Sequence, residues 1–239
     1  MANTINVLLW NCRGILSKHT ELHKLSQNRE IIILTETWLQ SNKQLHLNGY
    51  STIRADRQGS RGGGVACLIK NPIRYQHIPI DNQVDNHTQV LAIHLLTSPE
   101  PVNLVVIYRP PGSSLKYQQW KPFLANLCLP GSTIIAGDLN ANHPAWNSER
   151  EDNAGSSLLK VIQENNLFIH NTDTKSHIGS PGQRNNNLDL ILFTMDIAHL
   201  IVSNQLDDSH GSDHFPIETQ ILHRSPFLRR TYKLSTKKT

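Results

Sequence analysis

The chain has 239 residues, of which 38% are hydrophobic, and a formal net charge of +4 at pH 7. This length and composition allow one domain of two packed layers with a substantial core. The longest apolar runs, such as 103–108, are far shorter than a membrane span, and the first ten residues lack the basic and then apolar pattern of a signal peptide. We therefore expect a soluble, intracellular protein with no membrane partner.

The positive charge is concentrated at the carboxyl end. Six of the 23 Lys and Arg residues lie in 223–239, which has no acidic residue, so acidic residues outnumber basic ones in the rest of the chain. We therefore divide the chain into a globular domain, 1–222, and a basic tail or linker, 223–239. An arm that binds phosphate is the alternative interpretation of the tail.

The three cysteines, Cys12, Cys67 and Cys128, lie far apart, and none has a CxxC spacing. This spacing argues against a disulfide framework and against a zinc ribbon. We expect them to be reduced, half-buried thiols.

In chain order, the first half alternates between strand patterns and one helical pattern. Strands are predicted at 5–10, 31–34, 50–54 and 65–69. A helix is predicted between the first two strands, where Ile15, Leu22 and Leu25 recur at helical spacing. The first two strands end in polar groups that can bind a metal, at Asn11 and Glu36.

The second half opens with strands that follow each other closely, as in an antiparallel meander. These strands are predicted at 73–78, 90–96 and 102–108. Trp120, Phe123, Leu124 and Leu127 then fall on one face of a helix, whose first turn tolerates Pro122. A second helix is predicted at 156–165, and further strands at 168–170, 188–193, 200–202 and 215–222.

The segment 133–142, TIIAGDLNAN, is a short apolar strand that stops at Gly137. Asp138 and Asn140 follow two residues apart, so in an extended backbone both side chains point to one side. An ordinary Gly-Asp turn after a buried strand is the alternative.

Many strands, few helices and polar groups at successive strand ends predict an α/β protein with two mainly antiparallel sheets packed face to face and helices outside. In that architecture the strand ends of both sheets converge on one edge. The polar residues at those ends are Asn11, Glu36, Tyr108, Asp138, Asn140, Asp189, Asp213 and His214. Each residue alone has a purely structural explanation, but their joint position favours a functional site.

The segments WNCRG, TETW, YRPP, GDLNA, NLDLIL and SDHFPI occur in this order over 7–217. The set resembles the endonuclease/exonuclease/phosphatase superfamily, which includes exonuclease III, DNase I and inositol polyphosphate phosphatases. The resemblance implies a DNase I-like four-layer α/β sandwich and a Mg²⁺-dependent phosphoesterase.

Within that superfamily, the segments GDLNANHPAWNS, YRPPGSS and SDHFPI are similar to the endonuclease domain of jockey-like non-LTR retrotransposons. This similarity implies an enzyme that nicks double-stranded DNA so that the exposed 3′-hydroxyl primes reverse transcription. It also implies a reverse transcriptase domain downstream in a full-length protein, and a nuclear location when the enzyme acts on DNA.

Hydrolysis of a phosphodiester needs the phosphate charge to be screened, and Mg²⁺, or alternatively Mn²⁺, meets this need with oxygen ligands. We expect Glu36 to be the principal metal ligand, with Asn11 and Asp213 close by. The sequence leaves open whether one metal or two act.

The remaining predicted catalytic residues handle water and phosphate. Asp138, held by Asn140, is expected to orient and deprotonate the attacking water. His214, fixed by Asp189, is expected to stabilise the scissile phosphate, and Tyr108 to hold a non-bridging oxygen. Whether Asp138 or His214 is the base stays open.

Five residues are predicted to contact DNA: Arg13, Arg109, Asn142, Arg184 and Asn186. The Gly, Pro and Asn residues of 176–187 predict a hairpin or loop tip at the rim of the site. In this segment Arg184 can enter a narrow minor groove, and the amides of 183 and 185–187 can bond base edges or backbone. A solvated turn is the alternative.

Other activities of the superfamily fit less well. Abasic-site endonucleases resembling exonuclease III carry an aromatic residue shortly before the acid that corresponds to Asp189, where this chain has three asparagines, 185–187. No Lys and Arg cluster near the motifs would clasp a polyphosphorylated head group. A phosphomonoesterase, a lipid phosphodiesterase and an inactive nucleic-acid-binding remnant stay as alternatives.

Overall fold

The computed structural model describes residues 2–80, 85, 87–96, 101–112, 115–182 and 184–224. Gln183 of the predicted DNA-reading loop and the tail from residue 225 lie outside the described residues. The last strand runs to Arg224, so it continues two residues past the predicted domain end at 222.

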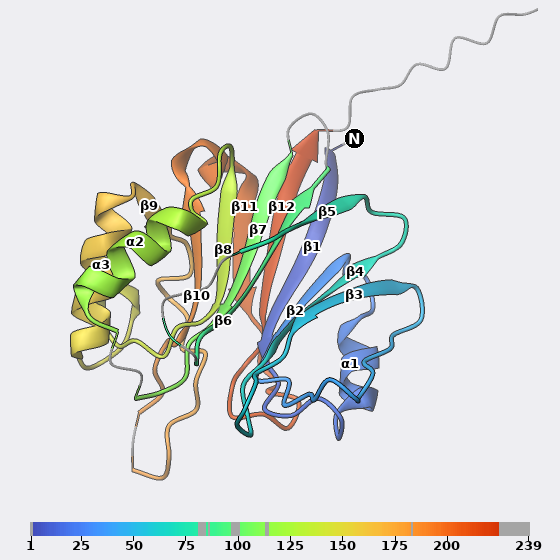
Figure 1. The fold of residues 1–239 in the computed structure, drawn as a ribbon, viewed down its shortest axis with the longest axis horizontal. Helices are drawn as coiled ribbons and strands as arrows, with labels where there is room; N and C mark the ends of the chain where they lie inside the picture. Colours follow the sequence, from blue (N-terminus) through green and yellow to red (C-terminus); the bar gives the residue numbers. More distant parts are fainter. Residues whose placement is uncertain are drawn as a thin grey trace, which may run out of the picture.

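Two six-stranded sheets form the centre of the molecule (Figure 1). The first contains β1 (Ala2–Asn11), β2 (Ile31–Thr35), β3 (Tyr50–Ala55), β4 (Val65–Lys70), β11 (Ile201–Gln205) and β12 (Ile217–Arg224). The second contains β5 (Tyr75–Ile78), β6 (Gln89–Leu95), β7 (Val102–Tyr108), β8 (Thr133–Asp138), β9 (Leu167–Ile169) and β10 (Asp189–Thr194).

The strand order is β11-β12-β1-β2-β4-β3 in the first sheet and β5-β6-β7-β8-β10-β9 in the second. Only the central pairs β1–β2 and β7–β8 are parallel among these neighbours. The prediction of mainly antiparallel sheets is therefore confirmed. Each parallel pair brings two strand carboxyl ends to the same edge.

Helices cover the outer faces of both sheets. They are α1 (His19–Leu25), α2 (Tyr117–Leu127) and α3 (Asn153–Glu164), together with the short 3₁₀ helix η1 (Pro144–Trp146). The 3₁₀ helix η2 (Met195–Leu200) instead places Ile197 in the core between the sheets. Figure 1 shows α2 and α3 on the second sheet and α1 on the first, which confirms the four-layer sandwich. In the part of the chain that is described, no helix is long and apolar enough to cross a membrane.

The central strands are buried on both faces, because each sheet lies between the other sheet and a helix. In β1, Val7 and Leu9 belong to the core between the sheets, while Leu8 and Trp10 pack with Leu22 of α1. Alternate side chains of one strand thus serve two cores. This double burial explains the continuous apolar runs in the sequence and holds the strand ends firmly in place.

The predicted start of the second helix needs correction. Helix α2 begins at Tyr117, so Pro122 lies in its second turn rather than its first. The early start escapes detection because residue 116 is a lysine, and the Gln119 side chain instead accepts the Lys116 N–H at 3.1 Å.

The cysteines are more buried than expected. Cys12 and Cys67 are fully buried, and burial raises the pKa of each thiol to about 12, while Cys128 is half-buried as predicted. Cys12 lies between the first sheet and α1, and Cys67 lies between the two sheets. In both places a cysteine packs as a small apolar side chain.

Candidate active site

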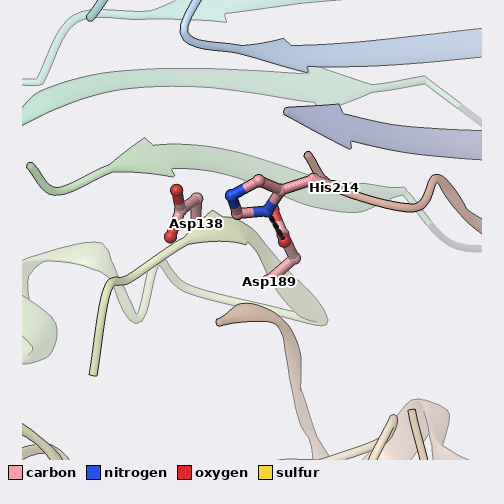
Figure 2. Close-up of side chains that lie close together, drawn as sticks. All are labelled: Asp138, Asp189 and His214. Atoms are coloured by element: carbon pink, nitrogen blue, oxygen red, sulfur yellow. Dashed lines mark hydrogen bonds and ion pairs between the residues drawn. The ribbon is translucent and has the colours of Figure 1, made fainter. Parts of the chain in front are cut away.

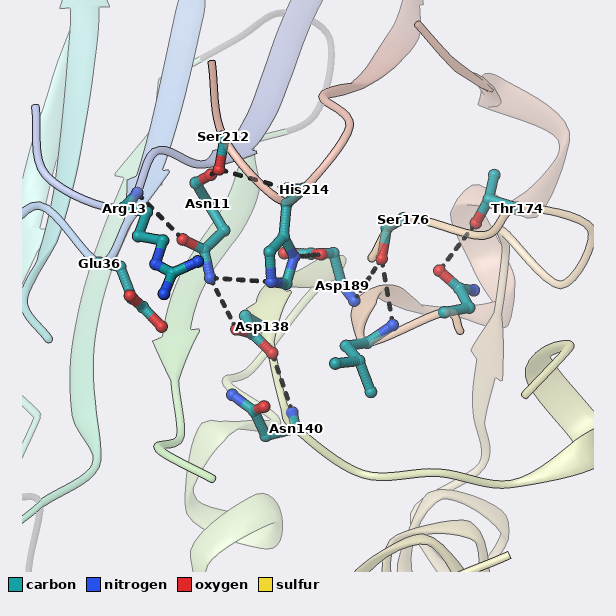
Figure 3. A network of polar contacts seen from close by, with 12 residues as sticks. Asn11, Arg13, Glu36, Asp138, Asn140, Thr174, Ser176, Asp189, Ser212 and His214 are labelled. Atoms are coloured by element: carbon teal, nitrogen blue, oxygen red, sulfur yellow. Dashed lines mark hydrogen bonds and ion pairs between the residues drawn. The ribbon is translucent and has the colours of Figure 1, made fainter. Parts of the chain in front are cut away.

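Strand register brings three predicted site residues together at one edge of the second sheet. Tyr108 of β7 is paired with Asp138 of β8, and Asp138 is paired with Asp189 of β10. In the first sheet, Asn11 at the end of β1 pairs with Thr35, directly before Glu36. The Asn11 amide donates to Asp138 Oδ2 at 2.8 Å and thereby connects the two sheets (Figure 3).

Asp138 is the central residue of this edge and is buried. Its Oδ1 accepts the backbone N–H of Asn140 at 3.0 Å. The φ angle of Asn140 is 44°, so the backbone is not extended here, contrary to the prediction, and the Asn140 side chain donates to the Arg109 carbonyl oxygen instead of lying beside Asp138. Burial, and then the neighbouring Asp189 carboxylate, raise the pKa of Asp138 well above its usual range. A Cβ on Gly137 would lie 1.8 Å from the Ile107 carbonyl oxygen, so only glycine lets β8 approach β7 at this point.

His214 and Asp189 form a buried pair (Figure 2). The ring Nδ1 and Asp189 Oδ2 are 2.5 Å apart, and the ring Nε2 lies 3.4 Å from the Asn11 amide nitrogen. Burial lowers the pKa of His214, but the Asp189 carboxylate outweighs it and the pKa rises to about 9. The predicted fixing of His214 by Asp189 is therefore present in the structure.

Asp138, Asp189 and His214 each offer one ligand atom, and these three atoms lie within 4.8 Å of one another. Figure 2 shows that Asp138 faces the His214 ring from the side opposite Asp189. Two carboxylates and one imidazole at this spacing can act on one water molecule and one phosphate group together.

Glu36 lies at the adjoining strand end and is held from two sides. Tyr108 donates its hydroxyl to Glu36 Oε1 at 2.8 Å, and the Trp38 indole donates to Oε2 at 3.2 Å. The φ angle of Glu36 is 51°, in the left-handed region, which costs a residue with a Cβ about 1–3 kcal/mol. The surrounding contacts thus hold the carboxylate in one place at the expense of backbone strain.

Asp213 and Asn11, the other predicted metal ligands, already have partners. Asp213 forms an ion pair with Arg13, and the Asn11 Oδ1 accepts the Arg13 N–H at 3.2 Å. The Asn11 amide nitrogen is directed to Asp138 rather than to Glu36.

The residues at this edge fit a hard divalent cation. They supply carboxylate oxygens and an amide oxygen, which are the ligands that Mg²⁺ prefers. Among the described residues, the buried Asp189 Oδ1 has no hydrogen-bond partner, as expected of an oxygen whose partner is a cation or a substrate group.

Comparison with known proteins agrees with this geometry. The family described as "Endonuclease-reverse transcriptase" matches residues 102–218. The RNA-directed DNA polymerase from mobile element jockey of Drosophila melanogaster is 29% identical over 228 residues, which cover 93% of this chain and 24% of that protein. The solved endonuclease domain of TRAS1, a telomere-specific non-LTR retrotransposon, has a TM-score of 0.75 at 18% identity and covers 92% of this chain and 98% of that one.

The matched family, the jockey polymerase and the shared fold together support the predicted resemblance to the endonuclease/exonuclease/phosphatase superfamily. The AP endonuclease LMAP from Leishmania major has a TM-score of 0.74 at 18% identity, covering 92% of this chain and 88% of that one. These similarities agree with the prediction of an enzyme and favour a nuclease. The chain spans about a quarter of the length of the jockey polymerase that it matches.

Two predicted DNA contacts have structural roles in this chain. Arg109 is 2% exposed, and its guanidinium donates to the carbonyl oxygens of Leu139 and Asn140 at 3.0 and 2.8 Å. The Asn140 side chain donates back to the Arg109 carbonyl oxygen at 2.8 Å. Arg109 therefore holds the loop after Asp138, and its side chain is not placed to contact DNA.

Asn142 is also buried, and its amide donates to the Asp152 carboxylate at 2.8 Å. Asp152 in turn caps helix α3 by accepting the Gly155 N–H at 2.7 Å. Asn142 thus joins the catalytic loop to α3. A buried polar network of this kind looks like an exposed polar loop in the sequence alone.

The remaining predicted DNA contacts lie at the surface. Arg184 is exposed and pairs with Glu149 at 2.9 Å. Asn186 forms an isolated bridge with His177, which itself bridges to His214. The described residues of this segment form a hairpin at the rim of the site, as predicted, and Gln183 lies outside the described residues.

Several supporting residues escaped the sequence reasoning. Ser176 accepts the N–H groups of Leu188 and Asp189 at 3.1 and 3.0 Å. Ser212 donates to the Asn11 carbonyl oxygen at 2.7 Å and accepts the His214 N–H at 3.2 Å. The only signal for Ser212 is its place in the motif SDHFPI, and nothing local distinguishes Ser176 from other loop serines.

Proposed function

We propose that this chain is a divalent-metal-dependent endonuclease that nicks double-stranded DNA and leaves a 3′-hydroxyl for reverse transcription. The observation that carries the proposal is the buried cluster of Asp138, Asp189 and His214, in which strand register pairs the two carboxylates and Asp189 holds the His214 ring. The similarity to the jockey polymerase supports DNA as substrate and a reverse transcriptase domain elsewhere in a full-length protein. Such an enzyme acts on chromosomal DNA in the nucleus.

Asp138 orients the attacking water and takes its proton. One of its oxygens is held by the Asn140 N–H and the other by the Asn11 amide, so the carboxylate has a fixed direction. A base held in this way needs little rearrangement before proton transfer.

His214 donates a hydrogen bond to the phosphate and stabilises its developing negative charge. Because Nδ1 is committed to Asp189, Nε2 is the ring nitrogen left for the substrate. Tyr108 lies beside them. Its hydroxyl exchanges the hydrogen bond to Glu36 for one to a non-bridging oxygen of the phosphate.

Glu36 would hold the cation, with Asn11 and Asp213 beside it. A divalent cation, when bound, screens the negative charge of the phosphate. Mg²⁺ suits these oxygen donors, and Mn²⁺ is an alternative with similar preferences.

The direct test is incubation of the purified chain with supercoiled plasmid in Mg²⁺ or in EDTA. We expect Mg²⁺-dependent conversion to nicked circles whose ends are extended by a DNA polymerase, which requires a 3′-hydroxyl. Release of inorganic phosphate without nicking would indicate a phosphomonoesterase. Binding without cleavage in Mg²⁺ would indicate an inactive remnant.

We expect Glu36→Gln to raise the Mg²⁺ concentration needed for half-maximal nicking. The amide keeps the size of the side chain but removes the negative charge that attracts the cation. The measurement is the nicking rate over a Mg²⁺ titration, with Glu151→Gln at an exposed carboxylate as the matched control. The same Mg²⁺ dependence in Glu36→Gln and wild type would remove Glu36 from the ligand set.

We expect Arg184→Ala to redistribute nick positions along a long duplex. Arg184 projects from the hairpin at the rim, where it can contact a narrow minor groove. End-mapping of nicks compares it with Lys121→Ala, an exposed cation on helix α2. An unchanged cleavage map would exclude Arg184 as a reader of DNA shape.

A further inference from the structure

An open groove of about 840 Å³ lies beside Glu36 and outside the catalytic cluster. Three loops line it: 13–17 after β1, 37–42 after β2 and 57–61 before β4. Its lining includes three arginines, and none of the lining residues, all of which the structure describes, is acidic. A groove of this charge attracts an anionic chain such as a phosphodiester backbone.

Trp38 presents an aromatic surface to this groove. The side chain is 38% exposed, although Trp10, Trp120 and Trp146 are fully buried. Exposure of a large apolar ring in a polar groove favours a role in binding. Leu16, also exposed, lies in the same lining.

The Trp38 ring is held in a fixed position. It lies against Gly14, where a Cβ would come within 2.8 Å of the ring atom Cε3. The φ angle of Gly14 is 91°, so a side chain there would be both strained and in collision with the indole. The bond from Nε1 to Glu36 fixes the ring edge. A ring held in this way loses little entropy when a planar group stacks on it.

The three arginines of the groove lining, Arg13, Arg57 and Arg61, differ in their partners and in their exposure. Arg57 packs over the Tyr108 ring at 5.4 Å and donates to the His87 carbonyl oxygen at 2.9 Å, so it connects the groove to the active site. Arg13 is half-exposed and pairs with Asp213, and Arg61 is exposed. A surface ion pair contributes little stability, so Arg13 can exchange its carboxylate for a phosphate.

We propose that this groove binds an unpaired nucleotide of the DNA strand next to the scissile phosphodiester. Its base stacks on Trp38, and the flanking phosphates contact Arg13 and Arg61. A basic groove with an aromatic surface is the combination that binds single-stranded nucleic acid with little regard to sequence. The inference rests on the proposed nuclease function and adds that the preferred target is DNA with a locally separated strand.

The test measures binding in EDTA, so that no cleavage is required. Fluorescence anisotropy compares an oligothymidylate with an oligomer of the same length whose bases are replaced by tetrahydrofuran spacers. We expect Trp38→Leu to weaken binding of the oligothymidylate about fivefold or more and to leave the spacer oligomer unchanged, since a stacked base contributes about that factor. Trp38→Phe keeps a ring and is expected to stay within about twofold of wild type.

The two variants share the loss of the indole bond to Glu36, so their difference isolates stacking. Arg61→Ala is expected to weaken both oligomers equally, because it removes a phosphate contact. In wild type, oligothymidylate should also quench tryptophan fluorescence while the spacer oligomer should not, since Trp38 is the exposed member of the four tryptophans.

Equal affinity of wild type, Trp38→Phe and Trp38→Leu for the oligothymidylate would overturn the inference, and so would equal losses for both oligomers. These results do not depend on nicking. Base-dependent binding by a chain that fails to nick plasmid would support the groove and refute the endonuclease. Normal nicking with base-independent binding would refute the groove alone.

Discussion

Asp138→Asn is expected to lower the rate of plasmid nicking by about 100-fold or more, the usual cost of losing a general base. Asparagine has nearly the same shape, so β8 and its pairing with β7 and β10 are retained. It accepts the Asn140 N–H as the carboxylate does, but it cannot take a proton from water. The measurement is the initial rate of conversion of supercoiled plasmid in saturating Mg²⁺.

The matched control is Asp207→Asn, which changes the same chemical group at an exposed position. It should nick at the wild-type rate. Circular dichroism and thermal melting establish that Asp138→Asn is folded. A folded Asp138→Asn variant that keeps more than about a hundredth of the wild-type rate would contradict the assignment of Asp138 as the base.

His214→Ala is expected to cause a loss of similar size, about 100-fold or more, because the phosphate loses its charge-stabilising donor. Asp189→Asn should also be strongly impaired, since the amide cannot hold a protonated imidazole as a carboxylate does. We expect the double variant to be no slower than His214→Ala alone. Residues that act as one unit give non-additive losses.

The comparison of single and double variants separates positioning from direct action. If Asp189 acts only through His214, its replacement costs nothing once the ring is gone. An additive double loss would show that Asp189 acts on the substrate or on a cation by itself, which its unpartnered Oδ1 also allows. Nicking rates of the four proteins, measured at one Mg²⁺ concentration, decide between these outcomes.

Local sequence determined most of the strands and the positions where they end. Runs such as 31–34 and 133–136 are apolar throughout because each strand is covered on both faces, and a polar residue marks the point where this cover stops. The sequence alone therefore places Asp138 and Asp189 at strand ends, without knowledge of how the strands pair. Helix boundaries were less visible, as at Tyr117, because capping there depends on the Gln119 side chain.

Tertiary structure decided which of the polar residues share contacts. The hydrogen bond from Asn11 to Asp138 joins two residues that are 127 positions apart and lie in different sheets, and no local pattern encodes that contact. Register placed Asp138 between Tyr108 and Asp189, whereas Asp213 is paired with Arg13.

Arg13 and Arg109 show most clearly what the sequence determines and what packing determines. Arg13 and Arg109 both follow a strand end, and the sequence assigned DNA contact to both. Arg109 is instead enclosed by the loop after β8, where two carbonyl oxygens accept hydrogen bonds from its Nη1, while Arg13 stays at the surface. The residue types and strand ends were determined by the sequence itself. Packing alone decided how exposed each arginine is and which groups it bonds. Both depend on segments that are distant in the chain and fold against the residue.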